Sequence, residues 1–282
     1  MLKSQSAMEY LMTYGWAILI IAVVLAVLFQ LGVFSSGNFQ PHAQAGSCQV
    51  SSTAAGVSLE GQCNGLLPQY VAQFNGNLDY ITAPSTSALS SLGGTNSLSI
   101  FAWVYAPYFS SGNERFVGFG PNTGLQFYEA AGSGHSLSMT NCWSNPSSTL
   151  VPSLGAWHFI GLVESSGTVT FYLDGQTPQS ISLAGGSCNT AGTLYVGSDD
   201  GPAGDYFVGH MANLQIYNTS LSQSEASALY LEGIGGAPIR PQNIVGWWPL
   251  NGNLNDYSGN ANNGAFDGVT FNSSWENSYT AP

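Results

Sequence analysis

Residues 157–175, WHFIGLVESSGTVTFYLDG, decide the fold of most of this chain. Residues 157–164 and 168–173 both alternate large apolar residues with smaller or polar ones, which is the period of a β-strand. Ser165-Ser166-Gly167 separates the two runs, and Asp174-Gly175 follows them. Gly, Ser and Asp are typical residues of tight turns. The segment therefore predicts a β-hairpin and a second turn into a further strand.

The strand pattern extends in both directions from this hairpin. Ser97–Tyr105, SLSIFAWVY, is apolar on both of its alternating faces, so it predicts a strand that is covered on both sides within a two-sheet sandwich. Ser222-Gln-Ser-Glu225 is a capping box and predicts one short helix. The alternating pattern predicts further strands at 115–120, 125–129, 194–197 and 207–217.

Five segments resemble, in sequence and in order, the laminin G-like or concanavalin A-like jelly rolls. They are FNGNLDYITAP at 74–84, LSIFAWVYAP at 98–107, the hairpin at 157–175, LYVGS at 194–198 and GHMANLQIYNTSLSQSEASALY at 209–230. The resemblance implies a mainly β fold, a two-sheet antiparallel jelly-roll sandwich.

The segment VGWWPLNGNLNDYSGNANNGAFDGVTF at 245–271 looks like the opening of such a domain, yet it stands at the end. Too few residues follow it to build a second jelly roll. We therefore expect one jelly roll over residues 69–275, in which residues 244–271 close the same sandwich. A truncated second repeat is the alternative.

The N-terminus has a different character. Residues 10–34 carry no charge, and a helix of that length would measure roughly 38 Å, enough to cross a bilayer with tilt. Upstream, Lys-Ser followed by Gln-Ser-Ala-Met-Glu resembles the class III signal peptide of archaeal pilin-like proteins. The resemblance implies cleavage by a prepilin peptidase between Ser4 and Gln5. Glu9 could then pair with the new α-amine of Gln5 on a neighbouring subunit, which would set the register of assembly.

These patterns divide the chain into a leader (1–4), a hydrophobic pilin-like or transmembrane helix (5–34), a linker rich in Ser, Gly, Ala and Gln (35–68) and the jelly roll. The expected location is the cell membrane with the C-terminal domain outside, or an extracellular filament after processing. The expected partners are the membrane, the prepilin peptidase and other pilin-like subunits. An uncleaved single-span anchor is the alternative.

Composition fits an exported, acidic protein. Only 6% of residues are charged and the net charge is −12, which argues against nucleic acid as a partner. Four cysteines in the exported part favour two disulfides; three connectivities are open, and proximity favours Cys48–Cys63 and Cys142–Cys188. Asn218 and Asn272 each begin an N-x-S/T triplet and are candidate glycosylation acceptors.

The sequence shows no catalytic pattern, so we expect no enzyme. Glucanases of related architecture carry carboxylates at E-x-D-x-E spacing, but Glu129, Glu164, Glu225 and Glu232 are isolated along this chain. His158 lies inside an apolar strand pattern and is expected to be a satisfied strand histidine.

The jelly-roll family instead implies ligand binding, often to glycans and sometimes with calcium as a cofactor. Oxygen-rich clusters suited to calcium could equally be ordinary Asx turns. The candidate calcium ligands are Asn77, Asp79, Asp199, Asp200, Asp205, Asp256 and Asn260. Trp143, Trp247 and Trp248 lie outside the best core strands and are candidates to stack on sugar rings, with core filling as the alternative.

Two functions of different classes follow. The first is a pilin-like or membrane-anchored adhesion protein that displays a lectin-like domain for carbohydrate or surface binding. The second is a structural filament or envelope subunit that binds no glycan.

Overall fold

The computed structural model describes residues 14, 18–24, 67–92, 96–120, 124–141, 144–185, 192–199 and 205–282. The chain forms two compact units, Met1–His42 and Ala43–Pro282. In the first unit, Tyr14 and residues 18–24 are helical, and most of the predicted hydrophobic helix lies outside the described residues. None of the helices in the described part of the chain has the length and apolar character needed to span a membrane.

The larger sheet of the second unit is built around β3 (Ser97–Tyr105), which pairs along its whole length with β7 (Trp157–Ser165). On its other side β3 pairs with β11 (Val208–Tyr217). The strand order is β14-β1-β11-β3-β7-β8-β9, and β12 also pairs with β11. The remaining strands are β14 (Thr270–Asn272), β1 (Val71–Asn75), β8 (Thr168–Leu173), β9 (Gln179–Ser182) and β12 (Ile244–Trp248).

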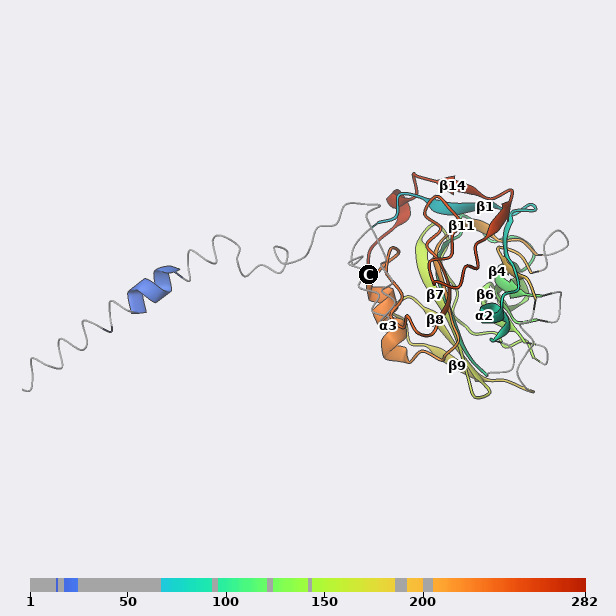
Figure 1. The fold of residues 1–282 in the computed structure, drawn as a ribbon, viewed down its shortest axis with the longest axis horizontal. Helices are drawn as coiled ribbons and strands as arrows, with labels where there is room; N and C mark the ends of the chain where they lie inside the picture. The colour runs from blue at the N-terminus through green and yellow to red at the C-terminus, as the bar shows by residue number, and fades with distance from the viewer. Residues whose placement is uncertain are drawn as a thin grey trace, which may run out of the picture. The chain divides into compact units, whose positions relative to one another are not determined.

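The smaller sheet lies against one face of the larger one, and its strand order is β13-β2-β10-β4-β5-β6. Its strands are β13 (Ala265–Asp267), β2 (Tyr80–Ala83), β10 (Leu194–Val196), β4 (Glu114–Phe119), β5 (Gln126–Ala130) and β6 (Ser136–Thr140). The strand pairs of both sheets are antiparallel in the described residues. The predicted two-sheet antiparallel jelly-roll sandwich is confirmed (Figure 1).

The hairpin predicted within residues 157–175 is formed by β7 and β8. Ser165 pairs with Thr168, so the loop between the strands has only two residues. Both of them, Ser166 and Gly167, have positive φ, 47° and 82°. This is the geometry of a type I′ turn, whose twist matches that of the two strands.

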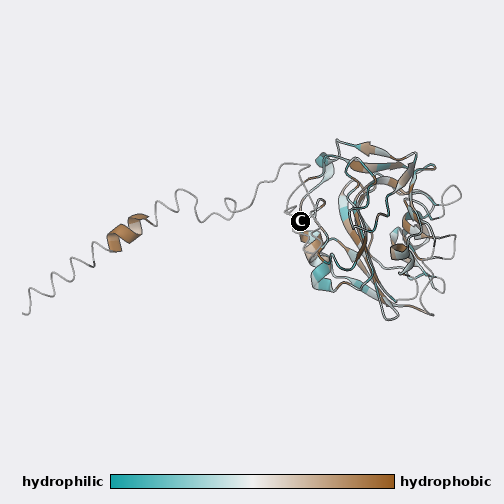
Figure 2. Ribbon diagram, viewed as in Figure 1, coloured by the Kyte–Doolittle hydropathy of each residue, from teal (hydrophilic) through white to brown (hydrophobic). Residues whose placement is uncertain are grey.

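The two faces of the larger sheet are covered by different elements. Leu98, Ile100, Ala102 and Val104 of β3 point into the interior between the two sheets. Phe101 and Trp103 point the other way, into a second apolar cluster with residues of helix α3 (Gln223–Leu231) and of the C-terminal tail. We call these the interior cluster and the outer cluster. Figure 2 shows hydrophobic residues along the strands and hydrophilic ones on part of α3.

Helix α3 begins where the sequence predicted. The Ser222 side chain accepts from the Glu225 backbone N–H and the Glu225 side chain accepts from that of Ser222, so the capping box is complete. Ala226 and Leu229 are buried in the outer cluster. The Trp103 ring stacks on Tyr230 with 6.0 Å between centroids. Besides α3, residues 67–282, where the structure describes them, contain three single-turn helices: α2 (Ser87–Ser90), η2 (Ala131–Ser133) and η3 (Glu276–Ser278).

The C-terminal segment contributes strands to both sheets. β12 pairs with residues 214–217 of β11, while β1 pairs with residues 208–211 on the same side. β14 pairs with β1, and β13 pairs with β2 of the other sheet. These pairings place residues 244–272 in the same sandwich as the strands that precede them.

Candidate functional site

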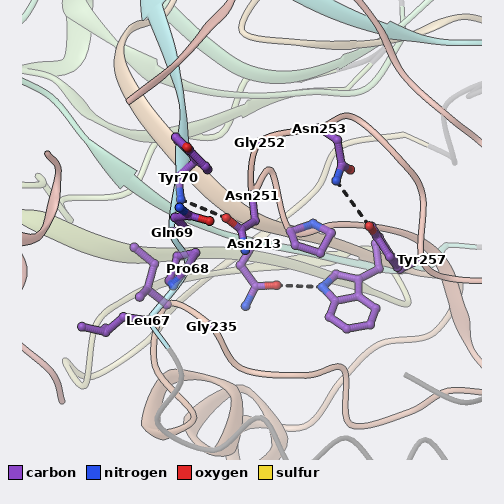
Figure 3. Close-up of a pocket in the computed structure, with 13 residues that line it drawn as sticks. Leu67, Pro68, Gln69, Tyr70, Asn213, Gly235, Asn251, Gly252, Asn253 and Tyr257 are labelled. Atoms are coloured by element: carbon purple, nitrogen blue, oxygen red, sulfur yellow. Dashed lines mark hydrogen bonds between the residues drawn. The ribbon is translucent and has the colours of Figure 1, made fainter. Parts of the chain in front are cut away.

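A cavity of about 400 Å³ opens where the chain enters β1 and where β12 ends. Its apolar wall includes Leu67, Pro68, Ile234 and Pro249. Its other residues, apart from glycines, carry aromatic rings or side-chain amides: Tyr70, Trp247, Tyr257, Gln69, Asn213, Asn251 and Asn253. Figure 3 shows these side chains around the cavity.

Trp247 forms one wall and is held on three sides. Its indole N–H donates to the Oδ1 of Asn213 at 2.8 Å, and its backbone N–H donates to the Oδ1 of Asp256 at 2.9 Å. The Tyr257 ring meets the indole edge-on, with 6.0 Å between centroids and 64° between planes. Trp247 is only 4% exposed, whereas Tyr257 is 42% exposed. Tyr257 is therefore the aromatic face that a ligand can reach most fully.

Asn213 is the polar centre of the cavity wall. The β11–β3 register shifts between Ala212 and Gln215, and Asn213 takes a left-handed φ of 52°, which Asn tolerates better than most residues. Its Nδ2 donates to the Gly236 carbonyl at 2.7 Å, and its Oδ1 also accepts from the Gln215 side chain at 3.0 Å. This buried network fixes the orientation of the amide, and through it the indole of Trp247.

The opposite wall carries amides with spare hydrogen-bonding capacity. The Tyr70 backbone N–H donates to the Oδ1 of Asn251 at 2.9 Å, and the Nδ2 of Asn253 donates to the Tyr257 hydroxyl at 3.4 Å. Within the described residues, the Nδ2 of Asn251 and the Gln69 side chain make no hydrogen bond. Amide donors and acceptors beside aromatic rings suit a ligand with both hydroxyl groups and apolar faces.

Two of the three predicted sugar-stacking tryptophans, Trp247 and Trp248, lie in the described residues. Trp248 is 2% exposed, belongs to the interior cluster and donates its indole N–H to the Asn262 carbonyl at 3.0 Å. Trp247 and Trp248 are both buried, because successive residues of β12 point into the outer and the interior cluster, which is the core-filling alternative. Trp247 also lines the cavity. Trp143 lies outside the described residues.

Two of the three predicted calcium clusters are closed turns. The Oδ2 of Asp79 accepts from the Asn75 backbone N–H at 2.8 Å, and the Oδ1 of Asn75 accepts from that of Asn77 at 2.7 Å. Asp256 accepts from two backbone N–H groups besides that of Trp247, and from the Ser258 hydroxyl. The Asn260 amide donates to two carbonyls of β12. These are the Asx turns of the alternative interpretation.

In the third cluster a guanidinium lies beside the carboxylates. Arg115 is 3.2 Å from the Oδ2 of Asp205 and 3.9 Å from that of Asp199, while Asp200 lies outside the described residues. Across the described part of the chain, no group of three or more His, Cys, Asp or Glu side chains could hold a metal ion. Calcium therefore stays a prediction that rests on the family resemblance.

The predicted processing, assembly and disulfide residues are outside the described part of the chain: Ser4, Gln5, Glu9, Cys48, Cys63, Cys142 and Cys188. The two glycosylation candidates differ. Asn218 is exposed, and its Oδ1 accepts from the Asn243 side chain at 3.0 Å. Asn272 is half-buried in β14, where its Nδ2 lies 3.4 Å from the Nε2 of His210.

A pair of buried glutamates escaped the sequence analysis. Glu129 is isolated along the chain, but the register of β4 and β5 places it directly opposite Glu114. Burial, and then the neighbouring Glu114, raise the pKa of Glu129 from 4.5 to about 8. The Nδ1 of His135 is 2.7 Å from the Oε1 of Glu129. The adjoining cavity measures about 10 Å³, the space of one water molecule, so no sugar fits between these groups.

The sequence also did not predict that Ser153, His158 and Asp174 form a hydrogen-bonded row. The Nδ1 of His158 is 2.7 Å from the Oδ2 of Asp174, and its Nε2 is 2.8 Å from the Oγ of Ser153. The Ser153 backbone N–H also donates to that Nε2, at 3.1 Å, and the Oδ1 of Asp174 accepts from the Phe159 N–H at 2.8 Å. The row thus fastens the loop before β7 to the turn after β8. His158 is a satisfied histidine, as the sequence suggested.

Comparison with known proteins bears on the fold and the family. No curated protein matches the chain. A proposed carbohydrate-binding protein from Bacteroides ovatus superposes with a TM-score of 0.59 at 16% identity, over 73% of this chain and 60% of that one. The chain thus spans less than two thirds of that protein. The heptameric SAP-like pentraxin of Limulus polyphemus gives 0.51 at 16% identity, over 72% and 94%.

The family is shown by the sequence itself. Residues 75–227 match the model of a laminin G family described as the concanavalin A-like lectin/glucanases superfamily. This match covers more than half of the chain and takes in β2 to β11 and the first part of α3. The chain belongs to the concanavalin A-like lectin/glucanases superfamily.

Proposed function

We propose that the jelly roll binds carbohydrate in the cavity lined by Tyr70, Trp247 and Tyr257. The observation that carries the proposal is the composition of this cavity: an exposed tyrosine ring beside amides that have unused donors and acceptors. A pyranose ring offers apolar C–H faces and equatorial hydroxyls, which such a lining complements. The superfamily and the Bacteroides ovatus protein support the same ligand class.

Binding fits the described residues better than catalysis. The buried glutamates adjoin a space of about 10 Å³, and the Ser153–His158–Asp174 row closes a loop with its backbone and side-chain hydrogen bonds. Neither arrangement lines the cavity of about 400 Å³.

The test is a glycan array probed with the full chain in detergent micelles, followed by titration of each hit. Tyr257→Ala should weaken binding about tenfold, because an aromatic contact contributes roughly 1 kcal/mol beyond its buried area. Tyr108→Ala is the matched control, since Tyr108 is 53% exposed but does not line the cavity. An array without hits, or hits equally insensitive to both changes, would overturn the proposal.

We further propose that the domain is displayed by a pilin-like N-terminus. Support comes from the Lys3-Ser4 and Gln5-to-Glu9 match and from the uncharged residues that follow it. N-terminal sequencing of native material should begin at Gln5, and Glu9→Ala should reduce filament yield without loss of the folded domain. A mature chain that begins at Met1 would favour the single-span anchor.

The second candidate function is a structural filament or envelope subunit. Its supporting observation is the pilin-like match at Lys3-Ser4 and Gln5-to-Glu9, which concerns export and assembly and not what the exposed domain binds. Filaments that contain the protein, together with an empty glycan array, would favour this function.

A further inference from the structure

The cavity has a second property besides its aromatic and amide lining, which is its charge. None of its lining residues is Asp, Glu, Lys, Arg or His. A carboxylate or sulfate on a ligand would therefore meet no countercharge there. An uncompensated charge that leaves water for a partly enclosed site carries a desolvation cost that no contact offsets.

No cation from elsewhere in the described part of the chain is free to enter the cavity. Arg115 is 9% exposed and lies between Asp199 and Asp205, with its guanidinium 4.1 Å from the Tyr128 ring centroid. Arg240 is paired with Glu225. The third basic residue of the chain, Lys3, is outside the described residues.

The histidines of the described residues are also engaged elsewhere. His135 contacts Glu129 and His158 contacts Asp174. His210 stacks on the Tyr105 ring with 5.3 Å between centroids, and burial lowers its pKa, so it stays neutral near pH 7.

Negative charge lies close to the cavity, and no positive charge lines it. Asp256 lies directly behind the wall, since its carboxylate accepts the backbone N–H of Trp247, and the whole chain carries a net charge of −12. Like charges repel an acidic ligand over distances up to the Debye length, about 8 Å at physiological salt.

We infer that this cavity selects uncharged glycans and rejects acidic ones such as uronate-containing, sialylated or sulfated chains. The inference rests on the proposed carbohydrate site and adds its ligand class. The free Nδ2 of Asn251 and the Gln69 amide serve as the hydroxyl-binding groups, because an amide presents a donor and an acceptor to neighbouring hydroxyls at no cost in charge.

The experiment compares ligands that differ only in charge, titrated into the full chain in detergent micelles. The probes are cellotriose, xylotriose and N,N′-diacetylchitobiose as neutral glycans, sialyllactose against lactose, and trigalacturonate against its methyl ester. We expect the neutral member of each binding pair to bind at least tenfold more tightly. The affinity of the neutral ligands should not change with salt, since no ion pair forms.

A gain-of-function variant keeps the inference falsifiable. Gln69 is exposed at the cavity, so Gln69→Lys places an ammonium group there without burial and should recover about tenfold in affinity for the acidic member of each pair. Gln223→Lys is the matched control, because it adds the same charge at an exposed position outside the cavity, and it should leave the preference unchanged.

The outcomes separate the two proposals. Equal or tighter binding of the acidic members, lost on Tyr257→Ala, overturns the inference and leaves the carbohydrate site in place. Failure of Gln69→Lys to improve acidic binding also overturns it. Absence of binding by every probe overturns the proposed function and this inference with it.

Discussion

The two faces of the larger sheet are both buried, but their chemistry differs. The interior cluster is aliphatic and phenylalanine-rich, and in the described residues its tryptophan, Trp248, donates its indole N–H to the carbonyl of the buried Asn262. The outer cluster contains four tryptophans and several tyrosines: Trp103, Trp157, Trp247, Trp275, Tyr105, Tyr172, Tyr217, Tyr230 and Tyr279. Two facing sheets enclose the interior cluster. A single helix and an irregular tail cover the other face, where the indole N–H groups of Trp157, Trp247 and Trp275 donate to a carbonyl or a side-chain amide oxygen.

Removal of the tail is the strongest test of this comparison. A chain that ends at Gly235 loses β12, β13 and β14, and with them Trp248 from the interior and Trp247 and Trp275 from the outer cluster. Each large aromatic residue is worth about 3–5 kcal/mol when buried, against a typical total of about 5–15 kcal/mol. We expect global unfolding of residues 70–232.

A thermal melt followed by near-ultraviolet circular dichroism measures this effect. The intact chain should show one cooperative transition and the truncated chain none. An unchanged transition would mean that residues 244–272 are a separate unit rather than strands of the same sandwich.

A pair of single substitutions then compares the two clusters directly. Phe171 is fully buried in the interior cluster, and Trp275 is 1% exposed in the outer one. The Trp275 indole donates to the Pro68 carbonyl at 3.2 Å, and its own carbonyl accepts from the Trp157 indole at 3.4 Å. Phe171→Ala and Trp275→Ala should each lower the free energy of unfolding by about 3–5 kcal/mol.

Urea denaturation gives both values. Trp275→Phe should cost about 1–3 kcal/mol, because it keeps most of the ring and leaves the Pro68 carbonyl without its donor. A cost below about 1 kcal/mol for Trp275→Ala would show that the outer cluster is a surface layer and not a second core.

The free energy of unfolding should depend on pH through a buried carboxyl group on the interior side of the sheets. Glu129 lies two residues after Phe127 in β5, on the same face towards the interior cluster, and its pKa is raised from 4.5 to about 8 in the folded state. The folded chain therefore binds the proton more tightly than the unfolded chain. The stabilising effect is complete below pH 4.5 and is lost as pH rises through about 8. The slope should reach at most about 1.4 kcal/mol per pH unit.

Stability measured from pH 4 to pH 9 in wild type and in Glu129→Gln tests this contribution. The amide cannot ionise, so the variant should show a flatter decline. Glu225→Gln is the control, since this carboxylate lies at the outer side. Burial raises the pKa of Glu225, but the Ser222 N–H and Arg240 lower it further, so the pKa is lowered overall. An equally steep decline in Glu129→Gln would contradict the assignment.

Glycan attachment is the mildest probe. In a host that glycosylates exported chains at N-x-S/T, mass spectrometry of glycopeptides should find Asn218 occupied and Asn272 bare. Asn218 is exposed just after β11, whereas the Asn272 amide lies against His210 within the folded sheet. The attached glycan should change the free energy of unfolding by less than about 0.5 kcal/mol, which is the usual size of the effect of a surface substitution. Equal occupancy of both would mean that β14 opens readily.

Local patterns predicted much of this fold. The double apolar face of Ser97–Tyr105, the capping box at Ser222 and the hairpin at 157–173 each depend on neighbours in sequence, and each forms as expected. The short strands β2 and β6 were not predicted, because four or five residues carry too weak a period.

Local sequence patterns did not predict the cavity. Its walls come from residues 67–70, from Asn213, from residues 234–235 and from residues 247–257, which are far apart in the sequence and meet only in the folded domain. Asn213 lies in a bulge, where the register between β11 and β3 shifts, and its side chain contacts Trp247. The local sequence contains no pattern that predicts this register shift. The opposition of Glu114 and Glu129 likewise follows from the register of β4 and β5. Tyr257, between polar residues, gave only a turn signal.

The position of β1 has a mechanical consequence. β1 lies between β11 and β14, so tension on the chain before Leu67 enters the sandwich through a strand that is held by ladders on both sides. Such a load must shear two ladders together, which resists force better than peeling one edge strand. The same entry residues, 67–70, line the cavity and are clasped by Asn251 and Trp275. A force applied to the chain before Leu67 would therefore strain the cavity before it reaches the rest of the sandwich.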